Sequence, residues 1–417
     1  MLRDITPTAA ESKVLSALSM NGLSEEPLEV VKYNDEPKIP TYACLPNERA
    51  REKYLCNEAY GQGSALNTTV AKIKATAEFL ERLAISNPQK RDISIKAYEP
   101  DLCANPNMFL HYSNAQINLH GQRYRGSKND VYRWVNAVNH LTGSKILVPA
   151  QLVYISKLFS SEPEIAPEQI TTGAALGGSI KKTFESGFLE VVERDAFMLS
   201  YLTKRKLTKV NHFPGSIDNM INYLKRYYLD VFVFDITTDL QIPVFMTIVV
   251  DKRGFGPGIS VGLKSGFDIE HVIFGSIMEA IQPRRQARFN KDTTTNFKFP
   301  KEQEVDSMQA RYFYWYPTGM IKNLNFMLKC KKIVNFNNLS NYVSSVEEGV
   351  RQLKDREYHI FYVDMTLNEI KKAGFVAGKV LIPELQPLYL DERSQVLYSV
   401  HGGSIKPIKG LKPHPFA

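Results

Sequence analysis

The sequence predicts an α+β protein in which mixed β-sheets pack with helices, and three observations favour this class. The chain has 417 residues, 43% hydrophobic and 23% charged, which is enough to bury a substantial core. Apolar residues recur at helical spacing over 65–86, 171–202 and 267–289. Short runs rich in β-branched residues lie between and after these segments, as is typical of strands.

We expect one domain over 1–417, with an N-terminal segment of about 1–60, a core of about 61–290 and a C-terminal part of about 291–417. The first part predicts a helix over Ala9–Met20 and a strand at Ile39–Tyr42. Gly61-Gln62-Gly63 predicts a turn, either a phosphate loop or a plain turn with Ser64 or Asn67 capping the helix that follows. That helix, 65–86, is expected to bury Leu66, Val70, Ile73, Ala77, Leu80 and Leu83.

The remaining elements follow from the same patterns. Residues 87–130 are polar and loop-rich, and 131–154 predict a strand, a turn and a second strand. A glycine-rich segment at 171–178 leads into a long helix ending near Leu202. Further elements are two paired strands (Asp230–Phe234 and Pro243–Asp251), a helix over Phe267–Phe289 that Pro283 kinks or ends, a helix near 345–354, and strands at His359–Asp364 and Val376–Leu388.

One short motif, ExxER, occurs twice on predicted helices: Glu78, Glu81 and Arg82, then Glu190, Glu193 and Arg194. Residues three and four apart project from one helix face. If the two helices face each other, four carboxylates come together, and such a cluster needs cations. Hard oxygen ligands suit Mg²⁺, and the arginines would suit phosphate. The alternative is two ordinary surface ion pairs, worth a few tenths of a kcal/mol each.

The run TTGAALGG…GFLEVVERDAF resembles the signature of the YcaO family. Within that family, its residues are most similar to those of the cyclodehydratases of azoline-containing peptides. Further similarity lies at 61–82, 230–251 and 376–388. The resemblance implies a YcaO-type fold with an ATP site between the ExxER helices. It implies ATP- and Mg²⁺-dependent phosphorylation of a peptide amide oxygen, through which Cys, Ser or Thr of a precursor peptide is cyclised.

The resemblance also implies roles for particular residues. Glutamates of both motifs would bind Mg²⁺: Glu78, Glu81, Glu190 and Glu193. The candidates for contact with ATP are Arg82, Arg194, Gln282, Arg284, Gly63, Ser64 and Lys182. In the azole-forming branch a proline-rich C-terminus reaches towards the active site, which makes Pro415, Phe416 and Ala417 candidate catalytic residues. A disordered tail is the alternative.

Two lysines depart from the family pattern. Lys74 stands where the first motif usually has a serine, and Lys182 where a metal-side glutamate is usual. Glu185 would replace that glutamate only if the helix shifts, since it lies roughly 300° further around. These lysines leave open a non-catalytic scaffold with a degraded ATP site. A thioamide synthase that uses a sulfide donor is the other enzymatic alternative.

Charge and composition limit the partners. The net charge of +8 favours an anionic partner such as a nucleotide or an acidic leader peptide. The sequence contains no block of basic residues with interleaved aromatics, so it does not favour nucleic acid as a partner. No apolar run is long enough for a membrane span. Four separated cysteines fit a cytoplasmic protein. The resemblance adds a homodimer, a leader-recognising E1-like or other partner protein, and a flavin dehydrogenase in the same complex.

Overall fold

The computed structural model describes residues 22–56, 59–89, 92–120, 130–165 and 168–416. Among these residues, the strands form four sheets. A three-stranded sheet has the order β1-β2-β3 (Leu28–Glu29, Thr41–Cys44, Gly61–Ser64). A small hairpin joins β15 and β16 (Tyr398–Ser399, Gly403–Ser404).

The five-stranded sheet has the order β11-β10-β9-β8-β12. Its strands are Ile259–Ser265, Val244–Asp251, Leu229–Asp235, Thr208–Asn211 and Lys332–Asn335. All neighbours are antiparallel except β8 and β12, which are parallel. The predicted pair of strands at 230–251 is confirmed as β9 and β10, in which Phe245 lies opposite Asp235.

The six-stranded sheet has the order β4-β5-β13-β14-β7, and β6 also pairs with β5. Its strands are Ile93–Ala97, Val131–Asn139, Phe361–Asp364, Val376–Leu381, Ala174–Gly177 and Lys145–Pro149. The predicted strand–turn–strand over 131–154 is therefore confirmed, but its second strand stops at Pro149 and continues as a 3-10 turn. Likewise β14 ends at Leu381, before Pro383, rather than at Leu388.

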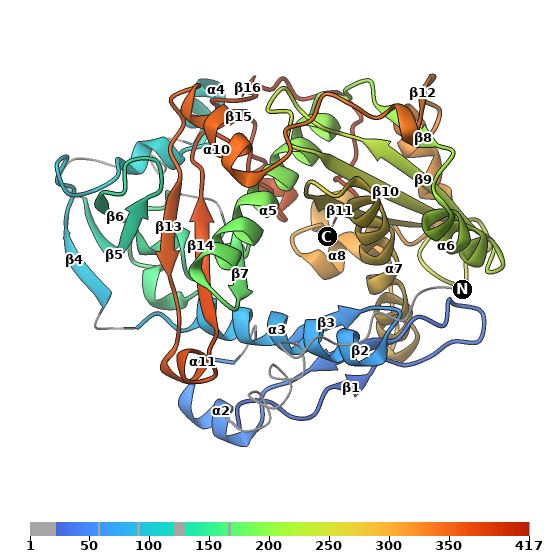
Figure 1. Ribbon diagram of the computed structural model, residues 1–417, viewed down its shortest axis with the longest axis horizontal. Helices are drawn as coiled ribbons and strands as arrows, with labels where there is room; N and C mark the ends of the chain where they lie inside the picture. Colours follow the sequence, from blue (N-terminus) through green and yellow to red (C-terminus); the bar gives the residue numbers. More distant parts are fainter. Residues whose placement is uncertain (1–21, 57–58, 90–91, 121–129, 166–167, 417) are drawn as a thin grey trace.

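Three long helices cover these sheets (Figure 1): α3 (Thr68–Ser86), α5 (Ile180–Leu202) and α7 (Ile269–Thr293). α5 packs between the two large sheets, contacting β14 and β7 on one side and β10 and β11 on the other. α3 and α7 both contact β3, and each begins at a side-chain cap, Asn67 and Asp268. The shorter helices lie around this frame: α2 (Glu48–Lys53), α4 (Asn114–His120), α6 (Gly215–Lys225), α8 (Met308–Tyr314), α9 (Asn325–Leu328), α10 (Val346–Lys354) and α11 (Asn368–Lys372).

This architecture confirms the predicted class of mixed sheets packed with helices, while several predicted details were wrong. Pro283 does not end α7, which runs on to Thr293. The loop-rich stretch at 87–130 contains β4 and α4. The predicted helix Ala9–Met20 lies outside the described residues, and the division into three parts stays a prediction.

The predicted turn Gly61-Gln62-Gly63 is instead the strand β3, which lies directly under α3. A Cβ atom on Gly63 would lie 2.3 Å from the Ala71 carbonyl oxygen. This close approach requires small residues on the helix, so Ala71 and Ala75 face the sheet and are fully buried. The predicted buried side was right for Leu80 and Leu83 and wrong for Leu66, Val70, Ile73 and Ala77, which keep some exposure.

Candidate functional site

The first ExxER motif is fixed by the strand beneath it. Glu78 accepts a hydrogen bond of 2.7 Å from the backbone N–H of Gln62 on β3. Its other oxygen accepts from Arg82, at 2.8 Å from Nη2. One carboxylate therefore has two fixed donors, and its direction is set before any ligand binds.

The second motif repeats this arrangement on α5. Glu190 accepts from the backbone N–H of Gly173 at 3.1 Å and pairs with Arg194 Nη2 at 3.0 Å. Arg194 also pairs with Glu193. Gly173 has φ +83°, a conformation that glycine adopts without strain, and its carbonyl lies against Gly187 of the helix.

A third, partial version of this arrangement, which the sequence reasoning missed and in which Pro283 stands in place of the arginine, lies on α7. Glu279 accepts a hydrogen bond of 2.9 Å from the backbone N–H of Leu263 on β11, as Glu78 does from β3. Gly262 lies under Ala280 as Gly61 lies under Phe79: a Cβ on either glycine would be 2.3 Å from the helix backbone nitrogen. Three residues after Glu279 comes Gln282, in the position of Glu81 and Glu193. Three helices thus present an ExxE or ExxQ pair.

The acidic side chains of these three helices influence one another. Burial raises the pKa of Glu81 well above its usual range, and the nearby Glu190 and Glu78 raise it further. Burial, with the charge of Glu193, raises the pKa of Glu279 to about 7. Burial also raises the pKa of Glu190. Carboxylates from α3, α5 and α7 therefore form one cluster, in which Glu81 interacts with Glu190 and Glu193 interacts with Glu279.

Lysines from other elements approach this carboxylate cluster. Lys379 on β14 is 3% exposed, and burial lowers its pKa to about 7, although Glu190 and Glu81 oppose the shift. The charge of Lys264 on β11 lowers the pKa of both Glu190 and Glu279, against the effect of burial. Lys74 has an exposed side chain whose ammonium donates to the Ser64 carbonyl at 3.3 Å, and its charge interacts with those of Lys264 and Glu279. Lys74 therefore lies at the cluster, as its place in the first motif suggested.

The carboxylate cluster fits Mg²⁺ held together with a nucleotide. Its ligands are hard carboxylate oxygens, and Mg²⁺ in nucleotide sites is bound by one or two carboxylates plus phosphate oxygens and water. Among the described residues, no group of three or more His, Cys, Asp or Glu side chains is arranged to hold a metal ion. Phosphate oxygens would thus complete the coordination, with Arg82 and Arg194 beside them.

The other predicted nucleotide contacts are placed as follows. Gln282 faces β3, donating to the Gln62 carbonyl at 3.2 Å. The Ser64 hydroxyl is buried and forms a hydrogen bond of 2.8 Å with the Thr41 hydroxyl. Gly63 lies directly under α3, where its lack of a side chain allows the helix to pack closely on β3. The side chain of Lys182 is 71% exposed and pairs with Glu185 at 2.8 Å. Glu185 therefore pairs with Lys182 near the start of α5 and not with Arg194.

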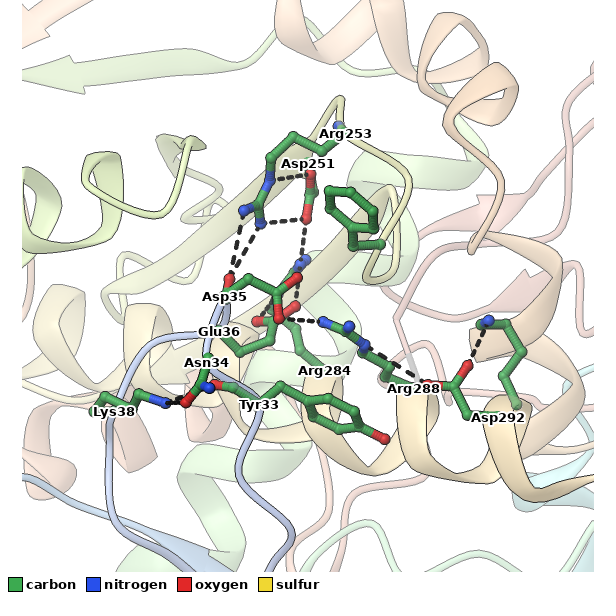
Figure 2. Close-up of polar contacts among 12 residues, drawn as sticks. Tyr33, Asn34, Asp35, Glu36, Lys38, Asp251, Arg253, Arg284, Arg288 and Asp292 are labelled. Carbon is green, nitrogen blue, oxygen red and sulfur yellow. Dashed lines mark hydrogen bonds and ion pairs between the residues drawn. The ribbon is translucent and has the colours of Figure 1, made fainter.

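Arg284 requires a correction. The sequence predicted that it contacts phosphate, but it is fully buried between Glu36 and Asp251, at 3.0 and 2.9 Å from Nη2 (Figure 2). Its Nη1 donates to the Pro257 carbonyl at 2.8 Å. A phosphate would have to displace both carboxylates, so we remove Arg284 from the candidate site.

The C-terminal segment reaches the second motif, and the disordered-tail alternative is wrong for the residues up to 416. The Pro413 carbonyl accepts from Trp315 Nε1 at 3.0 Å, and His414 is fully buried. Phe416 is 4% exposed, with the Arg194 guanidinium 4.5 Å from its ring centroid. Ala417 lies outside the described residues.

Two signals could have pointed to the residues that were missed. Glu279, with the predicted Gln282 three residues later, repeats the spacing of the first two motifs, in a helix that follows a strand containing a glycine. Lys379 is a single charge within the otherwise apolar strand β14. Neither signal is specific without the other helices for comparison. Of the described helices, none combines the length and apolar character needed to cross a membrane.

Comparisons with known proteins agree with this geometry. Two relatives are uncharacterized proteins: one from the tfuA 3' region of Rhizobium leguminosarum bv. trifolii, 30% identical over 123 residues, and one from Methanothermobacter thermautotrophicus, 22% identical over 275 residues. The matches cover 28% and 62% of this chain and 29% and 66% of those relatives, so the chain spans less than two thirds of their length.

Solved structures share the fold at low identity. A heterocyclase in complex with substrate and cofactor has a TM-score of 0.71 at 16% identity, covering 92% of this chain and 53% of that one. YcaO from Methanopyrus kandleri bound with AMPPCP and Mg²⁺ has a TM-score of 0.67 at 16% identity, covering 99% and 97%. A chain of the E. coli microcin synthetase McbBCD complex with pro-MccB17 bound has a TM-score of 0.63 at 15% identity, covering 94% and 96%.

The family model described as "YcaO cyclodehydratase, ATP- and Mg²⁺-binding" matches residues 62–386, which include all three glutamate-bearing helices. The chain belongs to the YcaO family, whose members bind ATP and Mg²⁺.

Proposed function

We propose that this protein activates a peptide backbone amide with ATP and Mg²⁺, so that a Cys, Ser or Thr side chain of a ribosomally made precursor cyclises onto it to give an azoline. The observation that carries the proposal is the repeated motif geometry. Glu78 and Glu190 each accept from a backbone N–H and pair with an arginine of the same helix. Glu81 of the first motif is close enough to Glu190 of the second for their charges to interact. Such an arrangement positions phosphates and balances their charge, which is what catalysis of phosphoryl transfer requires.

The chain's own residues divide this work. Glu78, Glu81, Glu190 and Glu193 would hold Mg²⁺, and we add Glu279. Arg82 and Arg194 would contact phosphate oxygens, with Gln282 near them. ATP would supply the phosphoryl group that leaves with the amide oxygen as phosphate, and Mg²⁺ would neutralise its charge. No covalent nucleophile of the protein is needed, because the substrate side chain attacks its own backbone.

Calorimetric titration with a non-hydrolysable ATP analogue, with and without Mg²⁺, tests the nucleotide site. Wild type should bind only with Mg²⁺, and Glu190→Gln should lose at least about tenfold in affinity, since a charged hydrogen-bonded ligand contributes about 1.5–3 kcal/mol. Glu185→Gln is the matched control, because Glu185 lies on the same helix but pairs with Lys182. No Mg²⁺-dependent binding to a folded wild type would favour the scaffold alternative.

Mass spectrometry of a modified precursor separates the two enzymatic alternatives. An azoline loses one water per ring, whereas a thioamide exchanges oxygen for sulfur and requires a sulfide donor. A leader-recognising partner protein is expected in the reaction, since the similar E. coli synthetase is a McbBCD complex with its precursor bound. We also expect a homodimer, with a flavin dehydrogenase acting on the azoline in the same complex. A product carrying sulfur in place of oxygen would overturn the azoline assignment.

A further inference from the structure

A cavity of about 110 Å³ lies next to the second ExxER motif, on the side of α5 that faces β14. It is bounded by α5, by β14 and the segment that follows it, and by the segments around 109–111 and 168–172. Its lining is mainly apolar and includes Phe109, Leu152, Val191, Ile382, Leu385 and Leu388. We call it the β14 cavity.

Two charged residues of the candidate site also line the β14 cavity, Arg194 and Lys379. Arg194 pairs with Glu190 at 3.0 Å, and Lys379 donates to the Ile170 carbonyl at 2.6 Å and the Val153 carbonyl at 3.3 Å. Because these contacts hold both cations in place, the cavity shares a fixed wall with the carboxylate cluster. A ligand in the cavity would lie beside the phosphate-binding groups.

The cavity also has one unmatched polar atom in its lining residues. Gln386 is 1% exposed, and its Oε1 has no hydrogen-bond partner among the described residues. Its amide nitrogen donates to the Val396 carbonyl at 3.0 Å, which orients the side chain. Oε1 is itself closed to solvent, so a ligand in the cavity could not bond to it unless the side chain moved.

The size and lining indicate the kind of occupant. A dry apolar cavity of about 150 Å³ accepts a benzene-sized molecule, so about 110 Å³ suits a branched aliphatic side chain. Binding sites are typically apolar hollows with a few placed polar groups. An aliphatic side chain of a peptide would fill such a hollow while the peptide backbone lay beside Arg194.

We propose that the β14 cavity receives an aliphatic side chain of the peptide substrate, from the residue whose carbonyl precedes the cyclising Cys, Ser or Thr. This assignment rests on the function proposed above and adds a substrate preference to it. With the side chain in the cavity, that carbonyl would lie near Arg194. Substrates with valine, leucine or isoleucine at this position should therefore bind better than those with glycine.

The experiment measures peptide binding rather than turnover. The probes are two blocked hexapeptides that differ only in the residue before a serine, leucine in one and glycine in the other. Dissociation constants are measured by ligand-observed NMR on the full chain, with and without an ATP analogue and Mg²⁺. The leucine peptide should bind at least about tenfold more tightly, since filling an apolar pocket is worth that much.

Two substitutions place the preference in the cavity. Leu388→Trp fills it and should abolish the difference between the peptides, while Leu388→Ala enlarges it and should shift the preference to a phenylalanine peptide. Leu102→Trp is the control, because Leu102 is 50% exposed and does not line the cavity. Circular dichroism checks that each variant is folded, and the two Leu388 variants test the cavity in opposite directions.

Several results would overturn the proposal. Equal or undetectable binding of the two peptides would do so, and so would an unchanged preference in both Leu388 variants. Competitive displacement of the leucine peptide by the ATP analogue would assign the cavity to the nucleobase. Failure of the analogue to bind, with the leucine preference intact, would instead contradict the proposed function alone.

Discussion

Arg284 shows how a buried charge is held by segments far apart in the chain. It joins Glu36, before β2, to Asp251 at the end of β10, and all three side chains are at most 1% exposed (Figure 2). Replacing one member leaves uncompensated buried charge, which typically costs about 3–5 kcal/mol. We therefore expect Arg284→Met to lower the free energy of unfolding by that amount, as measured by urea denaturation.

Arg288→Met is the matched control for Arg284→Met. Arg288 lies one turn further along α7, and its partner Asp35 is 36% exposed, so that pair is expected to contribute less than about 1 kcal/mol. An Arg284→Met protein as stable as wild type that had lost nucleotide binding would restore the phosphate role that the sequence suggested.

His401 is a second residue whose charge stabilises the fold, and it predicts a pH dependence. Burial opposes its charge, but ion pairs with Asp195 and Asp239 at 2.9 and 2.7 Å outweigh this and raise its pKa to about 9. The folded state thus keeps a proton that the unfolded chain releases near pH 6.5. The stabilisation, at most about 3 kcal/mol, is fully present below pH 6.5 and lost as pH rises through 9.

Urea denaturation at pH 6.5 and pH 9.5 measures this loss. Between the two values the free energy of unfolding of wild type should fall relative to that of His401→Gln, because glutamine has no proton to release. The difference between the two proteins isolates His401 from Lys379, whose pKa of about 7 changes stability in the opposite direction. His271→Gln, at an exposed position of α7, should behave like wild type. A variant with the full wild-type pH dependence would show that His401 is neutral in the folded protein.

At the scale of elements, the recurring unit is a strand with a helix packed directly on its glycines. We expect Gly63→Ala to destabilise the protein by about 1–3 kcal/mol, because its Cβ would lie 2.3 Å from the Ala71 carbonyl and 2.4 Å from the Ala75 nitrogen. The shift of α3 should also weaken Mg²⁺-dependent nucleotide binding, since Glu78 is fixed by the same strand. Urea denaturation and calorimetry measure the two effects.

Gly178→Ala provides the comparison, since no atom of the part of the chain that the structure describes lies within 4 Å of a Cβ built there. Its stability and nucleotide affinity should match wild type. If Gly63→Ala were equally neutral, the close packing of α3 on β3 would not be what positions Glu78.

The sequence could predict the ExxER helices because both of their signals are local. Apolar periodicity marks the helix, and the spacing of Glu78, Glu81 and Arg82 places them on one face. It could not predict that Gly61-Gln62-Gly63 is a strand, because that depends on pairing with β2 and on contact with α3. The third helix was found, but Glu279 gained meaning only when β11 was seen under α7 as β3 lies under α3.

Longer-range contacts could not be predicted either, because they too depend on which distant segments the fold brings together. Glu36 and Arg284 are 248 residues apart, and nothing local distinguishes Arg284 from its neighbour Arg285 or from a phosphate ligand. In the sequence, Lys379 is an ordinary charged residue of a predicted strand. Only the fold shows that Glu81 and Glu190 lie near it. The resemblance of the motifs supplied the family, whereas the partners of each charge required the fold.

At the scale of the whole molecule, residues 412–416 near the end of the chain pack against α5. Tyr201, near the end of α5, donates to the Lys412 carbonyl at 2.9 Å, and Arg311 on α8 donates to the His414 carbonyl at 2.9 Å. The segment therefore joins α5 to α8 and places Phe416 on Arg194. Since Arg194 also holds Glu190 and Glu193, the tail can influence the candidate site without contacting a ligand.

Phe416→Ala and Phe416→Leu separate packing from stacking at this position. Alanine removes a buried ring and should cost about 3 kcal/mol of stability, whereas leucine keeps most of the apolar burial. Both variants lose the contact between the ring and the guanidinium, which is worth about 0.5–2 kcal/mol. If the ring holds Arg194 in place, both variants should weaken binding of the ATP analogue, as measured by calorimetry, although only alanine strongly lowers the urea midpoint.

Phe255→Ala is the control, because Phe255 is 57% exposed and its replacement should change neither the nucleotide affinity nor the urea midpoint. Wild-type nucleotide affinity in Phe416→Leu would restrict the tail to a stabilising role and leave Arg194 positioned by its two glutamates alone.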